Sequence, residues 1–67
     1  MSDHVYAKTE VVGSSQVSIE DAVNQAVAYA AADKSVRWAE VKEIRCHLED
    51  GKVAHWQVTV AIGYRAQ

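Results

Sequence analysis

The chain has 67 residues and a single cysteine, so it cannot form an internal disulfide, and its length limits the surface that it can bury alone. A net charge of −2 with intermixed signs offers no basic stripe for nucleic acid, and no apolar run approaches the roughly 20 residues of a membrane span. We therefore expect a soluble cytoplasmic protein with no leader to remove, folded as one domain over residues 1–67 and stabilised by association with copies of itself.

The first half of the chain predicts a strand followed by a helix. Residues 4–12 are rich in Val, Tyr and Thr, and the turn-prone cluster Gly13-Ser14-Ser15 then predicts a loop. Ser18 is suited to cap a helix, and the acidic Glu20-Asp21 pair places negative charge near the positive end of the helix dipole. Apolar residues follow at helical spacing and form one narrow stripe: Ile19, Ala22, Val23, Ala26, Val27 and Ala30. We expect this helix to end near Asp33 to Ser35.

The second half of the chain predicts a β-hairpin. Residues 38–48 and 53–65 are strand-like, and the Asp50-Gly51 pair between them indicates a two-residue type I′ turn. The order strand, helix, strand, strand with a right-handed crossover predicts an α+β fold. In this β-α-β-β arrangement, a three-stranded antiparallel sheet with the last strand in its centre packs on one helix.

An uninterrupted hairpin register would sort the side chains onto two faces. Counting back from the turn predicts the pairs Glu49–Lys52, Leu48–Val53, Cys46–His55, Ile44–Gln57 and Trp38–Gly63. One face is the expected seat of the helix and holds Ala54, Trp56, Val58, Val60, Ile62 and Tyr64, with Ala39 and Val41 beside them. The other face mixes apolar and polar residues: Trp38, Glu40, Lys42, Ile44, Cys46, Leu48, Val53, His55, Gln57 and Thr59.

The second face needs a cover that one helix cannot supply, because a single helix covers only one face of a sheet. Self-assembly would cover it and would turn it into the wall of an interface or cavity. Glu43 and Arg45 fall on the helix side in this register. Either they extend past the end of the helix, or a bulge shifts the pairing.

Trp38 and Gln57 are the candidate binding residues on the second face. An indole at the start of a strand among polar neighbours suits stacking on an aromatic ligand, and packing at a subunit interface is the equal alternative. Gln57 offers an amide donor and acceptor together, the pattern that recognises a pyrimidine-dione edge. An ordinary surface glutamine is the alternative for Gln57.

The sequence predicts neither a metal centre nor an enzyme. In the uninterrupted register His47 and His55 lie on opposite faces, which leaves Cys46 and His55 as half of a site that needs about four ligands. A Gly-rich phosphate loop and the HExxH and GxSxG motifs are absent, and no third group orients the Cys46 and His55 pair. No catalytic residue and no metal ligand is therefore assigned.

Several sequence blocks, spaced along nearly the whole chain, resemble the bacterial type of the dodecin family. These blocks are His4-Val5-Tyr6, Val12-Gly13-Ser14-Ser15, Ser18-Ile19-Glu20-Asp21-Ala22, Trp38 followed by Glu40-Val41, and residues 51–60. The resemblance implies a hollow dodecamer with helices outside and sheets inside, in which flavins stack in pairs at two-fold axes. It also implies that Trp38 stacks on the flavin, that Gln57 bonds to its pyrimidine edge and that Arg45 lies near it.

The function implied by the resemblance is storage and photoprotection of a flavin, FMN or riboflavin, without turnover. Coenzyme A is a further ligand of some family members, for which Lys8 and Arg65 are candidates by charge alone. Two other functions stay open. One is a small flavin-dependent oxidoreductase, which would need an open flavin face for its substrate. The other is a structural homo-oligomer without flavin, in which Trp38 packs between subunits.

Overall fold

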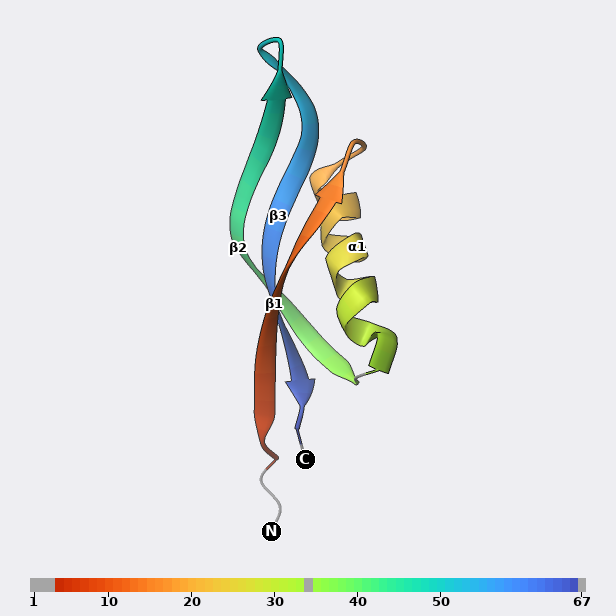
Figure 1. Ribbon diagram of the computed structural model, residues 1–67. Coiled ribbons are helices and arrows are strands. Elements are labelled where there is room, and N and C mark those ends of the chain that lie inside the picture. The colour runs from red at the N-terminus through yellow and green to blue at the C-terminus, as the bar shows by residue number, and fades with distance from the viewer. Residues whose placement is uncertain (1–3, 34, 67) are drawn as a thin grey trace.

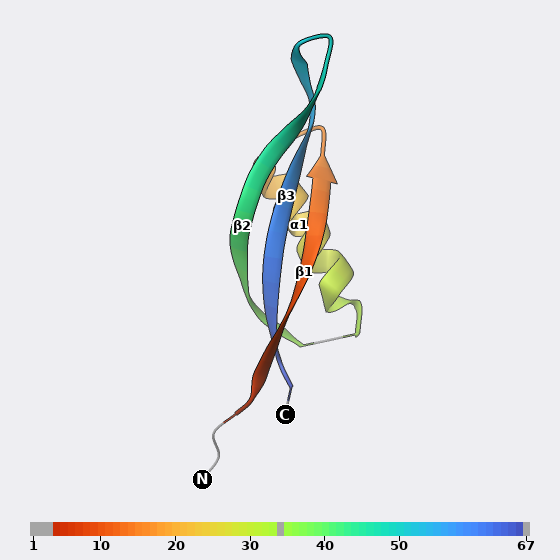
Figure 2. The same cartoon turned by 60° about the vertical axis from the view of Figure 1, so that its left-hand side comes forward.

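The computed structural model describes residues 4–33 and 35–66 (Figure 1). Its elements are, in order, β1 (Tyr6–Ser15), α1 (Ile19–Ala30), the 3-10 helix η1 (Ala31–Asp33), β2 (Val36–Glu49) and β3 (Lys52–Arg65). The sheet is antiparallel with the order β1-β3-β2, and α1 covers one of its faces (Figures 1 and 2). The predicted β-α-β-β fold is confirmed. The helix end predicted near residues 33–35 overlaps residue 34, which lies outside the described residues.

The hairpin of β2 and β3 turns at Asp50 and Gly51, whose φ angles are 54° and 75°. Positive φ at both central residues is the signature of a type I′ turn, so the predicted turn is confirmed. The pairing of β1 with β3 stops where Ser15 meets Trp56. The far end of the hairpin is therefore a two-stranded arm, which projects beyond the helix (Figure 1).

Hydrogen bonds of Ser15 and Ser18 join the end of β1 to the start of α1. The Ser18 hydroxyl accepts a hydrogen bond from the backbone N–H of Asp21 at 3.0 Å, which confirms the predicted helix cap. The hydroxyl of buried Ser15 donates a hydrogen bond to the Asp21 carboxylate at 2.6 Å and accepts one from the N–H of Val17 at 2.9 Å.

Helix α1 has 12 residues. No helix in the described part of the chain is long and apolar enough to span a bilayer.

Strand β1 continues through Gly13-Ser14-Ser15, so the predicted loop there is wrong. These three residues pair in order with Val58, Gln57 and Trp56 of the central strand. A Cβ at Gly13 would overlap the backbone carbonyl of Ala22. Glycine at this position lets the helix approach the sheet closely, and it does not mark a turn.

The core lies between α1 and the central strand. Three small residues of the helix, Ala22, Ala26 and Ala30, pack against the fully buried side chains of β3: Val58, Val60 and Ile62. The chain is elongated, measuring 57 by 19 by 13 Å, and leaves many large apolar side chains exposed. These are Val5, Tyr6, Val12, Val17, Tyr29, Trp38, Val41, Ile44, Leu48 and Val53. So many exposed apolar groups mark a candidate contact surface.

The register of the hairpin is interrupted by bulges. The predicted pairs Glu49–Lys52, Leu48–Val53 and Trp38–Gly63 are confirmed. The predicted pairs Cys46–His55 and Ile44–Gln57 are wrong, because Cys46 pairs with Trp56 and Ile44 with Val58. One extra residue of β3, Ala54, causes the shift, and an extra residue of β2, Lys42, restores the original count.

The bulge at Ala54 changes which side chains share a face. Arg45 pairs with Gln57, and Glu43 pairs with Thr59, so both charged residues lie on the side away from α1. Of the two explanations left open for them, the shifted register is the correct one. Ile44 pairs with Val58 and Cys46 pairs with Trp56, so both lie on the helix side. The prediction that placed them on the other face is wrong.

Candidate functional site

The candidate site lies on the sheet face away from α1, which we call the open face. Because buried Val58, Val60 and Ile62 point to the helix, the alternate residues of β3 define this face. On β3 they are His55, Gln57, Thr59, Ala61 and Gly63. Their partners are Trp38, Glu40, Glu43, Arg45 and His47 on β2, and Lys8, Glu10, Val12 and Ser14 on β1.

Trp38 lies over Gly63, its partner across the strands. A Cβ at Gly63 would overlap three indole atoms, Cδ2, Cε2 and Cζ2, so the ring presents its face to the glycine. Gly63 is buried, whereas Trp38 is 42% exposed. The sheet thus holds one face of the indole and leaves the other for an aromatic partner.

Tyr6 from β1 supports the edge of the same indole. Its ring centroid is 5.5 Å from that of Trp38, with 61° between the planes, which is an edge-to-face arrangement. Sequence reasoning missed both Tyr6 and the role of Gly63. The predicted pairing of Trp38 with Gly63 was the available signal for the glycine, because it already placed a residue without a side chain beside the ring.

Gln57 is flanked by two polar residues in one row across the sheet. Arg45 on β2 and Ser14 on β1 each pair with it. Gln57 is half-buried, and Arg45 is exposed. The row offers an amide, a guanidinium and a hydroxyl. These groups can donate hydrogen bonds to carbonyl and other acceptor oxygens, and the amide can also accept one from an N–H donor.

The indole and the Gln57 row lie far apart within one chain. Gln57 and Gly63 are six residues apart on β3, and a rise of about 3.3 Å per residue separates the two rows by about 20 Å. An isoalloxazine of three fused rings is shorter than this. The structure therefore brings Arg45 and Gln57 together but does not bring Trp38 to them, and one ligand touching all three needs a second chain.

An ion pair joins the Trp38 row to the next row of the sheet. Lys8 and Glu40 extend across the central strand, with Nζ and Oε1 3.5 Å apart and side chains 52% and 53% exposed. Such exposed pairs contribute less than about 1 kcal/mol. The charges on this part of the open face are thus partly balanced.

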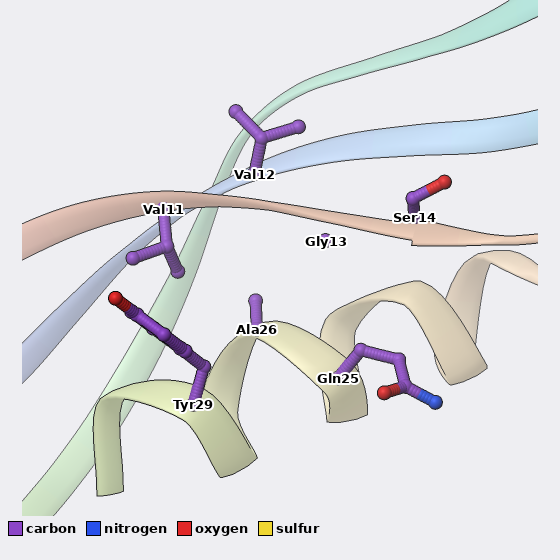
Figure 3. A pocket seen from close by; sticks show the side chains of 7 residues that line it. All are labelled: Val11, Val12, Gly13, Ser14, Gln25, Ala26 and Tyr29. Atoms are coloured by element: carbon purple, nitrogen blue, oxygen red, sulfur yellow. The ribbon is translucent and has the colours of Figure 1, made fainter.

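A groove of about 560 Å³ lies at one edge of the sheet, next to helix α1 (Figure 3). The free edge of β1 and helix α1 form its walls, and Tyr29 and Gln25 extend along the helix side. Its lining contains no carboxylate, no histidine and no cysteine: Val11, Val12, Gly13, Ser14, Gln25, Ala26 and Tyr29. The groove has the character of a contact surface.

The chain is similar in sequence and in fold to proteins of one family. The sequence model of the Dodecin family matches residues 5–67. The dodecin of Thermus thermophilus is 39% identical over 66 residues, which cover 94% of this chain and 93% of that protein. The structure of dodecin from Streptomyces coelicolor has a TM-score of 0.91 at 44% identity and covers 100% of this chain and 97% of its own.

One further dodecin and three variants of the T. thermophilus protein have the same fold. Dodecin from Streptomyces davaonensis has a TM-score of 0.90 at 37% identity, with 98% of each chain covered. The T. thermophilus dodecin has been solved as the variants R45A, W38F and R65A, each with a TM-score of 0.88 at 35% identity. The match over residues 5–67 and the high identity agree with the fold, and the chain belongs to the dodecin family.

Proposed function

We propose that the protein stores and shields a flavin, FMN or riboflavin, as stacked pairs between the Trp38 side chains of two neighbouring chains. The observation that carries this proposal is the seating of Trp38, one ring face on Gly63 and the side chain 42% exposed. An indole held in this way is a prepared stacking surface, because little conformational freedom is lost when a planar ligand binds. Membership of the dodecin family supports a flavin as that ligand.

The polar edge of the flavin would be bound by a different chain from the one that stacks on it. The distance of about 20 Å between the Trp38 and Gln57 rows supports this division. Gln57 would exchange two hydrogen bonds with the pyrimidine edge, and neighbouring Arg45 would add positive charge near its oxygens. The site would exist only in the assembly.

Variants of a relative support the choice of residues. The T. thermophilus dodecin has been studied as W38F, R45A and R65A, and this chain has Trp, Arg and Arg at its own positions 38, 45 and 65. Trp38 is a candidate from its residue type and its face of the sheet, whereas Arg45 is a candidate from the family resemblance and lies on the open face beside Gln57. Arg65 lies on β3 opposite Tyr6, at the same end of the sheet as Trp38.

The assembly would be a hollow dodecamer, the form that the family resemblance implies. Support comes from the surfaces that the chain leaves uncovered. β1 has a free edge beside the groove of Figure 3. Ile44 on β2 and the hairpin-arm residues Leu48 and Val53 are exposed. Burial of these surfaces against other copies would supply the stability that a short chain lacks.

Storage is favoured over enzymatic turnover because of the geometry of a stacked pair. Two flavins enclosed between two indoles would have both ring faces covered, which leaves no place for a substrate at the reactive face. Electron transfer from the indole would quench the excited flavin and so limit its photochemistry. Coenzyme A binding stays a prediction, and one of its two candidate residues, Lys8, already pairs with Glu40.

The test is a titration of FMN and of riboflavin with purified protein, followed by flavin fluorescence and light scattering. We expect strong quenching that saturates at about one flavin per chain, because two chains would enclose two flavins. Trp38→Ala should weaken binding about tenfold or more and restore fluorescence, since aromatic stacking alone contributes about 0.5–1.5 kcal/mol beyond burial.

Trp56→Phe is the matched control, because Trp56 is the second tryptophan and lies on the helix side opposite Cys46. It should leave quenching unchanged. Unchanged affinity and quenching in Trp38→Ala would refute the sandwich and favour a structural oligomer. Steady-state oxidation of reduced nicotinamide that is lost in Trp38→Ala would instead favour the oxidoreductase.

A further inference from the structure

The bulge at Ala54 brings His47 and His55 directly opposite each other. Their imidazole rings stack with centroids 5.1 Å apart and 23° between the planes. Without the extra residue in β3 the two side chains would lie on opposite faces of the hairpin. The bulge thus creates a pair of metal-binding side chains that an uninterrupted register would keep apart.

We propose that this pair binds Zn²⁺, with Glu49 as the third ligand and water in the fourth position. Two histidines, one glutamate and a water form the donor set of open, four-coordinate zinc sites. Two nitrogens bound to one tetrahedral zinc lie about 3.3 Å apart, given bonds of about 2.0 Å. Opposite residues on antiparallel strands have Cβ atoms about 5 Å apart, so ring rotation reaches this separation without movement of the backbone.

Glu49 is placed to complete the site. Its Oε2 is 3.7 Å from Nε2 of His47, and by alternation along β2 it lies on the same face as His47. The side chains of His47 and Glu49 are 51% and 72% exposed, so both are free to turn and solvent reaches them. No three such donors already converge within residues 4–33 and 35–66, so the site forms by side-chain rotation around the ion.

The histidine pair lies where an ion can reach it from solvent and where a bound ion would link two strands. β1 ends opposite Trp56, so His47 and His55 begin the two-stranded arm beyond the helix (Figure 1). A bound ion links β2 to β3 there and stiffens the arm. Arg45 is in the next row, about 7 Å along the strand. Its positive charge lowers the affinity of the site for Zn²⁺, whereas the negative charge of the Glu49 carboxylate raises it.

The test is a calorimetric titration of the full, untagged chain with Zn²⁺. His47→Asn and His55→Asn each remove one ligand and are expected to weaken Zn²⁺ binding about tenfold or more. Glu49→Gln is expected to weaken it less. His4→Asn is the matched control, because His4 precedes β1 and should not affect the affinity.

Histidine Cε1 NMR signals of the wild-type protein keep the test independent of how the variants fold. Zn²⁺ is expected to shift the signals of His47 and His55 and to leave the signal of His4 in place. Shifts confined to His4, binding lost only in His4→Asn, or no Zn²⁺ binding at millimolar concentration would each overturn the proposal. None of these readouts depends on flavin.

Discussion

On the helix side of the sheet, Val58, Val60 and Ile62 are fully buried beneath three alanines of α1. On the open face, alternate residues of the same strand are paired with half-exposed Trp38 and exposed Arg45. The helix side supplies the packed core, and the open face carries exposed polar and aromatic side chains. This division predicts that stability depends on the helix side and flavin binding on the open face, and substitutions on each face can test the separation.

The largest expected loss of stability comes from Ile62→Ala on the helix side. Ile62 is fully buried, and truncation of such a side chain costs about 2–5 kcal/mol of unfolding free energy. Urea denaturation at matched protein concentrations measures the loss, because assembly contributes to apparent stability. A loss below about 1 kcal/mol would mean that the subunit contacts, and not this core, hold the fold.

Gly13→Ala should cause the next largest loss. The new Cβ would overlap the carbonyl of Ala22, so the helix has to move away from β1. Overpacking of this kind costs about 1–3 kcal/mol. The same denaturation experiment measures it, and unchanged stability would show that the helix has room to shift.

Ser18→Ala should have a smaller effect, again on the helix side. The Ser18 hydroxyl accepts the N–H of Asp21, and loss of an N-cap costs about 1 kcal/mol. Flavin quenching of the folded protein should be unchanged, since the cap does not contact the open face. A change in quenching without a change in stability would contradict the separation of the two faces.

Most of the fold could be predicted from local patterns. Alternating apolar residues, the Ser18 cap and the Asp50-Gly51 turn each depend on neighbours along the chain, and each is confirmed. Gly13 was misinterpreted because glycine favours turns, whereas here it permits close approach of α1, a contact between distant segments.

The candidate site could be predicted only in part. Trp38 and Gln57 were placed on one face correctly, but the bulge at Ala54 was missed, although two consecutive apolar residues, Val53 and Ala54, interrupt the alternation there. A second sign was that Glu43 and Arg45 fell on the apolar side in the uninterrupted register. The stacked histidines follow from the same bulge and were therefore missed.

Gly63→Ala is expected to change stability least and binding most, and it is the matched partner of Gly13→Ala on the opposite face. The new Cβ would overlap the indole of Trp38. We expect the indole to turn away, because Trp38 is 42% exposed and is not packed in the core. Stability should change by less than about 1 kcal/mol, because the overlapped group is a side chain that can turn, whereas at Gly13 it is backbone. Flavin affinity should fall about tenfold or more, since the stacking surface is displaced. If Gly63→Ala instead lost stability and kept its affinity for flavin, Trp38 would be a packing residue, and the two faces would not divide stability from binding.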